Sequence, residues 1–511
     1  MTLATTHLWR LLIWGRTLAR HGALQGIERD PLTPPNVRRL VRVARFGTRQ
    51  PDAPDYAAAL QAIGPAAIKL GQALATRPDL VGDIAAANLL QLQDSLPPEP
   101  FPAIKAAIEK ALEAPLDTIF SSFDEEPVGA ASIAQVHHAV TTEGREVAVK
   151  VLRPGIEEEF ARALETYEWA AAHVELLGGE AERLRPRLVI AHFKQWTRRE
   201  LDLQREAASA SELRNNMVAE PNFHVPEIDW GRTARRVLTL EWLDGIKLSD
   251  RDALVAAGHD PTKLATTLVR AFLRQAVVDG YFHADLHQGN LFALADGRLA
   301  AVDFGIMGRI DRRARLWLAE ILYGLITGDY RRVAEIHFEA QYVPPHHNVD
   351  EFATALRAVG EPIRGLPVKQ ISIGRMLEGL FSITRDFDMQ TQPHLLLLQK
   401  TMVMEEGVAT TLDPDINMWE AAEPFLKDWL RTELGPEAYY ADRIIETVRA
   451  FKLIPDLIRR IDAAYPPVGG APPPPPLPEV AIIERKGWLA PTVSAIAAAA
   501  AAAAATYWLV G

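Results

Sequence analysis

The chain contains no cysteine among its 511 residues. This absence excludes disulfide bonds, thiolate metal sites, cysteine-ligated iron–sulfur clusters and cysteine nucleophiles, and it suits a reducing compartment. The sequence also lacks a basic charge balance, because 66 acidic residues outnumber 55 lysines and arginines and give a formal net charge of -11. Nucleic-acid-binding proteins normally show the opposite balance, so we expect no nucleic-acid partner.

The length is too great for a single compact core, so several units are expected. Changes in composition and hydrophobic periodicity predict an α+β protein with a small mixed lobe and a large helical lobe, a helical extension before them and a membrane helix after them. The predicted segments are a basic amphipathic start (1–50), a helical extension (51–120), a small mixed lobe with inserted helices (121–245), a large helical lobe (246–465), a proline-rich linker (466–487) and a transmembrane helix (488–510).

Both ends of the chain carry features of membrane proteins. Residues 488–510 contain no charged side chain, Arg485 and Lys486 precede them, and tryptophan and tyrosine flank them. This pattern predicts a single membrane span with the folded lobes on the cytoplasmic side, or the matrix side in a mitochondrion. A buried or disordered polyalanine tail is the alternative. The first 50 residues are rich in arginine, and Trp9 and Trp14 lie among them, which fits either an interfacial membrane helix or a surface helix packed on its own domain.

Short β-type runs identify the small lobe. Residues 134–140 and 145–151 form a predicted hairpin, and 236–242 form a further strand. Helical periodicity covers 156–218 and most of 254–465, apart from a β-like passage over 290–304. A small mixed lobe followed by a large helical lobe is the organisation of a kinase.

The strongest chemical signal is His-Ala-Asp-Leu-His-Gln-Gly-Asn at 283–290, followed by Asp-Phe-Gly at 303–305. Phosphoryl transfer requires a carboxylate near the acceptor oxygen and hard oxygen ligands for magnesium. An Asp-x-x-x-x-Asn loop before Asp-Phe-Gly supplies these groups in kinases. We therefore predict that Asp285 acts as the base or orienting carboxylate and that Asn290 and Asp303 bind Mg²⁺, with ATP as the nucleotide.

A zinc site made by His283 and His287 is a competing interpretation of the same loop. The spacing of four fits, but the glutamate of the His-Glu-x-x-His helix is absent, and Gly289-Asn290 is typical of a loop. We expect His283 to have a structural role instead.

Upstream residues complete the predicted ATP site. Val-Ala-Val-Lys at 147–150 matches the kinase strand whose lysine contacts the α- and β-phosphates, and Glu206 on a helix is the candidate carboxylate that orients Lys150. The remaining predicted ATP-binding residues are Gly129, Ala130, Ala131, Ser132, Ile133, Ala134, Gln135 and Val136 in the phosphate loop, together with Glu241 and Leu243 at the end of the 236–242 strand.

Two features of ordinary protein kinases are missing. The phosphate loop is rich in alanine instead of glycine, which restricts the backbone. No Ala-Pro-Glu segment follows Asp303, so the usual platform for a peptide substrate is absent.

These motifs resemble the UbiB/ADCK family of atypical kinases over about residues 64–417. Lys69, Gly71 and Gln72 look like the family's Lys-x-Gly-Gln signature, and Glu200 and Asp202 look like its Glu-x-Asp motif. The resemblance implies that the Lys-x-Gly-Gln helices fold over the substrate side of the nucleotide site, where Lys69 and Gln72 meet Glu200 and Asp202 and regulate access. The sequence departs from the family pattern at Gly129, where alanine is common, and at Ser209, where asparagine is usual.

The resemblance further implies ATP binding, ATPase or phosphotransferase activity and a role in ubiquinone biosynthesis at the inner membrane. Membrane lipid and quinone precursors, or the proteins that process them, are then the expected partners. Two alternatives stay open: a catalytically silent ATP-binding scaffold, and a small-molecule kinase. The second does not explain residues 69–72. A quinone-ring hydroxylase is disfavoured because no flavin fingerprint follows a strand and no metal triad is evident.

Overall fold

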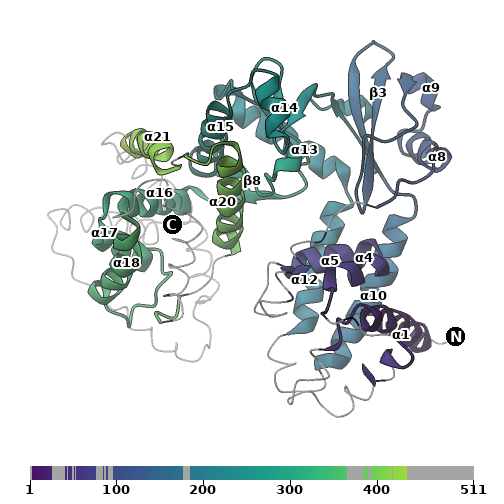
Figure 1. Cartoon of the computed structure of the whole chain (residues 1–511), viewed down its shortest axis with the longest axis horizontal. Coiled ribbons are helices and arrows are strands. Elements are labelled where there is room, and N and C mark those ends of the chain that lie inside the picture. The colour runs from purple at the N-terminus through teal and green to yellow at the C-terminus, as the bar shows by residue number, and fades with distance from the viewer. Residues whose placement is uncertain are drawn as a thin grey trace, which may run out of the picture. The chain divides into compact units, whose positions relative to one another are not determined.

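The computed structural model describes residues 3–25, 41–75, 96–175, 185–364 and 393–433, except for 43, 49–50, 52 and 417. It also describes a few positions within 85–92 and 383–389. The chain divides into two compact units, Met1–Ala438 and Tyr439–Gly511, and all described residues belong to the first (Figure 1). The predicted linker at 466–487 and membrane span at 488–510 lie outside the described residues.

The N-terminal extension is helical, as predicted. Up to residue 75, its longest described helices are α1 (Leu3–Arg20), α4 (Tyr56–Ile63) and α5 (Pro65–Ala75). Asp55 caps α4 by accepting a hydrogen bond from the amide of Ala58, and Gly64, at a φ of +123°, separates α4 from α5. Such a φ favours glycine, so the sharp change of direction between the two helices falls where the sequence allows it.

One face of α1 packs on the protein's own helix α10 (Ile156–Glu175). His7 Nδ1 lies 3.1 Å from Thr166 Oγ1, and the Trp14 and Tyr167 rings are 5.2 Å apart. The other face is exposed. It carries Trp9, Leu12, Ile13, Arg16 and Arg20, which follow the helical spacing of 3, 4, 7 and 11 residues. The packing on α10 agrees with the interpretation of a surface helix on its own domain, and the interpretation of an interfacial membrane helix stays a prediction.

The small lobe contains a five-stranded antiparallel sheet in the order β1-β3-β4-β6, with β2 paired to β3. The strands are β1 (Phe120–Phe123), β2 (Gly129–Ala130), β3 (Ala134–Thr141), β4 (Glu146–Leu152) and β6 (Val237–Glu241). The predicted hairpin is confirmed as β3–β4, and its turn contains Gly144 at a φ of +84°. Helices α8 (Phe101–Leu112) and α9 (Leu116–Ile119) cover one face of this sheet. Ile104 and Ile108 of α8 pack there with alternate buried valines of β4.

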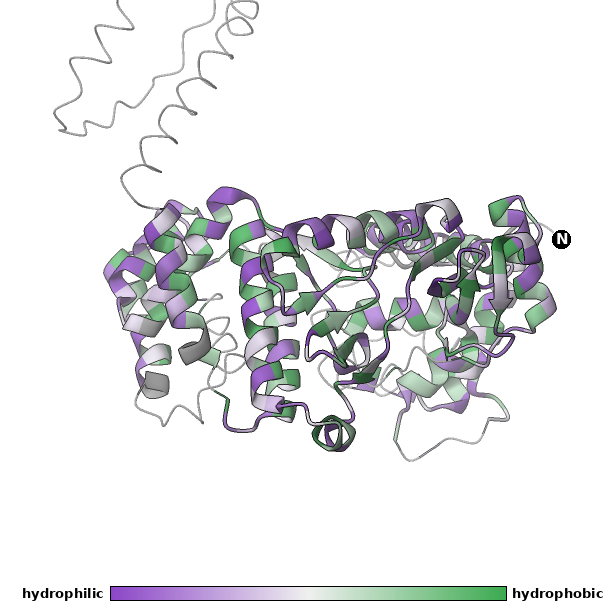
Figure 2. Ribbon diagram, turned by 90° about the horizontal axis from the view of Figure 1, so that it is seen from above, coloured by the Kyte–Doolittle hydropathy of each residue, from purple (hydrophilic) through white to green (hydrophobic). Residues whose placement is uncertain are grey.

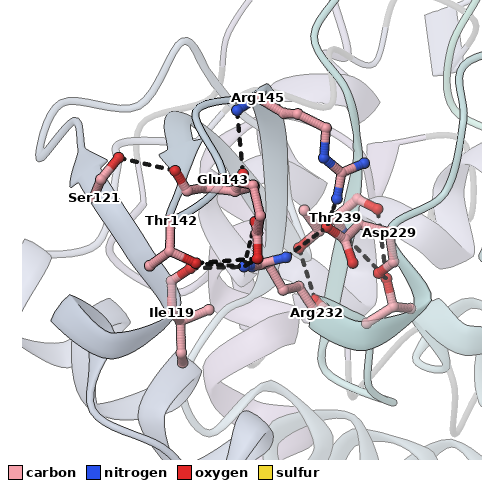
Figure 3. Close-up of polar contacts among 10 residues, drawn as sticks. Ile119, Ser121, Thr142, Glu143, Arg145, Asp229, Arg232 and Thr239 are labelled. Carbon is pink, nitrogen blue, oxygen red and sulfur yellow. Dashed lines mark hydrogen bonds and ion pairs between the residues drawn. The ribbon is translucent and has the colours of Figure 1, made fainter.

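Arg232 connects three parts of this lobe (Figure 3). Its guanidinium donates to the carbonyl of Ile119, to Asp229 Oδ2 at 2.9 Å, and to Glu143 in the hairpin turn at 2.8 Å. Arg145 donates to the same Asp229 oxygen at 2.8 Å. The hydrogen bonds from Arg232 lower the pKa of Glu143 to about 2. This network fixes the outer end of the hairpin and therefore the register of β4, which carries Lys150.

Inserted helices lie between β4 and β6 in the chain. They are α10, α12 (Pro186–Glu200) and α13 (Leu203–Asn216), and α13 packs against β6. The large lobe contains the following helices: α14 (Arg251–Ala256), α15 (Pro261–Leu273), α16 (Arg312–Thr327), α17 (Tyr330–Glu339), α18 (Val349–Arg364), α20 (Pro393–Leu412) and α21 (Met418–Glu433). The prediction of a mainly helical lobe is confirmed over these residues.

Short strands surround the predicted catalytic loop. A four-stranded sheet has the order β5-β10-β9-β7, and β11 pairs with β8. The strands are β5 (Phe223–His224), β7 (Gly245–Lys247), β8 (Tyr281–His283), β9 (Leu291–Leu294), β10 (Leu299–Ala301) and β11 (Met307–Arg309). Short 3-10 turns lie at Met217–Ala219, Trp230–Arg232 and Gln288–Asn290, and a π-helical turn at Arg274–Asp279 precedes β8. Gly308 allows β11 to approach β8, because a Cβ at this position would overlap the buried ring of Phe282.

Hydrophobic and hydrophilic residues alternate along the described helices (Figure 2). Within that part of the chain, no helix combines the length and the apolar character needed to cross a bilayer.

Candidate active site

Lys150 lies on β4, between strands β3 and β6, and forms an ion pair with Glu206. On β4 it pairs with Val136 of β3 and Leu238 of β6, and its Nζ lies 2.8 and 3.0 Å from the two carboxylate oxygens of Glu206. Glu206 projects from the first turns of α13 and is 7% exposed. The structure therefore brings Lys150 and Glu206 together, as the sequence predicted.

Asp303 is the third member of this cluster. Its Oδ1 lies 3.3 Å from Lys150 Nζ, and its side chain is 51% exposed. Its φ of +63° is a left-handed conformation that aspartate adopts uncommonly, which marks a sharp turn after β10. Burial alone would raise the pKa of Asp303, but Lys150 and Lys69 outweigh it and hold that pKa below its usual range. Asp303 thus presents an ionised carboxylate with an open side.

The loop from 283 to 290 is fixed from beneath by His283, which is fully buried at the end of β8. Its Nδ1 accepts from the amide of Asp285 at 3.1 Å, so Nε2 carries the proton and donates to the carbonyl of Val302 at 3.3 Å. Its backbone amide donates to Gln275 Oε1 at 3.0 Å, and burial lowers the pKa of the ring. Both ring nitrogens are used in backbone hydrogen bonds, which is the structural role expected for His283.

The predicted magnesium ligands fit their role. Asn290 Nδ2 donates to the carbonyl of Asp285 at 3.1 Å, which leaves Oδ1 for a ligand. The amide of Val302 donates to the carbonyl of Asn290 at 2.9 Å, so the residue directly before Asp303 is joined to Asn290. An amide oxygen and a carboxylate are hard donors of the type Mg²⁺ prefers.

The alanine-rich loop is more buried than the sequence suggested. Gly129 and Ala130 pair with β3, and Gly129 is exposed, whereas the side chains of Ser132, Ile133, Ala134 and Gln135 are buried. Arg153 anchors the loop by donating from Nε to the carbonyl of Ala131 at 2.9 Å. The exposed part of the loop is thus its beginning, and Val136 on β3 is half-buried.

An ion pair joins the Lys-x-Gly-Gln extension to the end of α12. Lys69 Nζ lies 2.8 Å from Glu200 Oε1, and the two side chains are 9% and 11% exposed. Gly71 lies where α4 and α5 meet, and a Cβ there would overlap Leu60 and Leu92. The expected contact between Lys69 and Glu200 is present. No contact of Gln72 or Asp202 with this pair is seen among the described residues, and Asp202 Oδ1 is buried there without a hydrogen-bond partner.

Two further predicted residues lie at the end of β6. The carboxylate of Glu241 accepts from the amide of Glu227 and from His224 Nε2, both at 3.0 Å. Any contact of Glu241 with a nucleotide would therefore come from its backbone. Leu243 follows β6 and is half-buried, and its role stays a prediction.

One charged neighbour of the catalytic loop was not predicted from the sequence. Lys400 of α20 places its Nζ 3.5 Å from Asp285 Oδ1. A lysine in a helix 115 positions downstream (400 minus 285) carries no local signal for such a contact.

Three features together define a kinase-like fold. They are a lysine paired with a helical glutamate, an Asp-x-x-x-x-Asn loop, and an Asp-Phe-Gly turn, in a chain with a mixed lobe and a helical lobe. Comparisons with known proteins agree. Residues 91–337 match the ABC1 atypical kinase-like domain and residues 356–417 match the UbiB helical domain. A protein of Marinobacter nauticus, described as "Probable protein kinase UbiB", is 43% identical over 382 residues, covering 74% of this chain and 70% of that protein. The chain therefore belongs to the UbiB family.

The same fold occurs in a solved structure. The Mycobacterium tuberculosis protein Rv3197, determined in complex with erythromycin, is similar with a TM-score of 0.50 and 24% identity, covering 70% of this chain and 91% of that one. At this level of identity the likeness concerns the fold alone.

Proposed function

We propose that this protein binds ATP with Mg²⁺ and hydrolyses it or transfers its γ-phosphoryl group in support of ubiquinone biosynthesis at a membrane. The proposal rests mainly on one observation, the contact of Lys150 with both Glu206 and Asp303. These residues lie beside the loop that carries Asp285 and Asn290. The link to ubiquinone rests on the family and on the name of the Marinobacter relative.

Each residue of the site has a defined task in this reaction. Lys150, oriented by Glu206, binds the α- and β-phosphates, and Asp285 orients the acceptor hydroxyl or water and receives its proton. Asn290 and Asp303 hold Mg²⁺, which when bound neutralises charge on the β- and γ-phosphates. His283 keeps the loop in place through its two backbone hydrogen bonds.

The acceptor is not a generic protein. The segment after Asp303 runs through β11 directly into α16, so the chain has no peptide platform there. The family resemblance implies that the Lys-x-Gly-Gln helices cover the entrance to the site, and the ion pair between Lys69 and Glu200 supports this arrangement. A lipid-like quinone precursor or water fits a guarded site better than an extended peptide.

Phosphate release by the purified full chain tests the proposal. We expect slow, Mg²⁺-dependent turnover that increases with anionic liposomes or a quinone-precursor phenol, and loss of turnover with retained Mg-ATP binding in Asp285→Asn. A chain that binds Mg-ATP but releases no phosphate under any of these conditions would instead be a scaffold.

Membrane association is the second part of the proposal. The outer face of α1 displays Trp9, Leu12 and Ile13, which are 61%, 47% and 49% exposed, followed by the exposed Arg16 and Arg20. A helix with an apolar, tryptophan-bearing face and arginines suits the interface of an anionic bilayer. The uncharged stretch at 488–510, preceded by Arg485 and Lys486, supplies a single membrane span with the lobes on the cytoplasmic or matrix side.

Vesicle flotation separates the two membrane elements. A chain ending at Pro478 should keep part of its binding to anionic vesicles, and Trp9→Ala with Leu12→Ala in that chain should reduce the remainder about tenfold or more. Trp230→Ala is the matched control, because Trp230 is 52% exposed elsewhere on the protein. Unchanged binding of the truncated double variant would exclude α1, and full binding by the truncated chain would exclude 488–510 as the main anchor.

A further inference from the structure

Lys400 is the one charged side chain of α20 that reaches the catalytic loop among the described residues. Its Nζ lies 3.5 Å from Asp285 Oδ1, with side-chain exposures of 36% and 29% for the two residues. Lys400 belongs to the UbiB helical domain at 356–417, outside the ABC1 kinase-like domain at 91–337. The contact therefore joins the helical domain to the catalytic carboxylate.

The position of Lys400 is set by the packing of α20. Leu398, Thr401 and Met402 are buried at 3%, 0% and 5% exposure on the inward side of the helix. The helix packs against α15 and against β11, the strand that begins two residues after the Asp-Phe-Gly turn (Figure 1). Arg251 Nε donates to the carbonyl of Leu412 at 3.1 Å and fixes the last turn of α20. A buried helix face thus determines which way Lys400 points.

The catalytic loop needs a cation that it does not itself contain. Residues 285–290 read Asp-Leu-His-Gln-Gly-Asn, without lysine or arginine. His287 accepts the amide of Gly289 at Nδ1. The two other lysines of the site are paired, Lys150 with Glu206 and Asp303, and Lys69 with Glu200. Catalysis of phosphoryl transfer depends largely on positioning and electrostatic stabilisation, so the carboxylate that receives the acceptor proton has to be held in place.

We infer that Lys400 is a positioning residue for phosphoryl transfer. Its ammonium holds Asp285 Oδ1 and leaves the second carboxylate oxygen for the acceptor. In the reaction, the acceptor oxygen forms a bond to the γ-phosphorus while the bond to the β–γ bridging oxygen breaks, and ADP leaves with that electron pair. The acceptor proton passes to Asp285. The inference rests on the proposed function and adds that the helical domain completes the active site.

The test measures steady-state ATP hydrolysis by the full chain with Mg²⁺. Lys400→Met should lower kcat about tenfold, the size of one lost charged contact, and change KM for ATP by less than about twofold. Lys400→Arg keeps the charge and should restore most of kcat. Lys427→Met, an exposed lysine of α21, is the control and should match the wild type.

Wild-type kcat in Lys400→Met would overturn the inference. Equal losses of kcat in Lys400→Arg and Lys400→Met would also overturn it, because they indicate a packing role for the side chain. If the unmodified chain binds Mg-ATP in a thermal shift assay but never turns it over, the proposed function fails and the role of Lys400 fails with it.

Discussion

Replacement of Asp303 by Asn should abolish the stabilisation that Mg-ATP gives to the folded protein. A ligand that binds only the native state stabilises it by RT ln(1 + [L]/Kd), which is about 2.7 kcal/mol at a hundredfold excess over Kd. Asp303 contributes the ionised, half-exposed carboxylate of the metal site. An amide keeps the shape and one oxygen but loses the charge that holds a divalent cation. The thermal midpoint should then be the same with and without Mg-ATP.

Asp296→Asn is a closely matched control for this experiment. Asp296 lies in the turn between β9 and β10, seven positions before Asp303 (303 minus 296). Its side chain is 52% exposed and pairs with Arg298, away from the loop residues. The control variant has the same change of charge and should keep the full Mg-ATP shift. An undiminished shift in Asp303→Asn would show that Asp303 is not a metal ligand.

The parts of the fold that the sequence predicted are those with a local pattern. The β3–β4 hairpin follows from alternating residues around a turn that contains Gly144, and α16 follows from helical periodicity. The pairing of Lys150 with Glu206 was predictable because each sits in a motif of known order, although 56 positions separate them. The known order of these motifs thus predicts a long-range contact that no local pattern in the sequence indicates.

The unpredicted parts depend on tertiary contacts. Strands β5, β7, β8 and β11 are two or three residues long, too short to show a period of two. The buried state of Ser132 depends on the packing of its loop, since a serine among small residues looks like an exposed turn. Lys400 is a further case, because a helix gives no sign of which distant loop one of its lysines will meet.

Replacement of Lys150 by Met should destabilise the fold as well as remove ATP binding. Lys150 is 15% exposed and Glu206 7% exposed, so the variant leaves a buried carboxylate without its cation. Removal of one partner from a buried ion pair costs about 3 kcal/mol in the free energy of unfolding. Lys150→Met combined with Glu206→Met should recover at least half of that loss, because it removes the uncompensated charge, yet it should still not bind ATP. No recovery in the double variant would attribute the loss to packing.

The dependence on pH gives an independent check of the same ion pair. Burial lowers the pKa of Lys150, but Asp303 and Glu206 outweigh burial and raise it above its usual range, while the pKa of Asp303 is lowered. The raised lysine pKa contributes stability below its unfolded value of about 10.4 and loses it at higher pH, and the lowered Asp303 pKa contributes stability above about 3.9 and loses it at lower pH. Lys150 and Asp303 therefore give their full contribution between roughly pH 4 and 10. Burial raises the pKa of Glu206 even beside Lys150, and Lys150→Met leaves this carboxylate without its cation. The gap in unfolding free energy between wild type and Lys150→Met should therefore narrow as the pH falls and the carboxylates of Glu206 and Asp303 take up protons. A gap that stays the same in acid would mean that the methionine variant lost packing contacts and not the charge of Lys150.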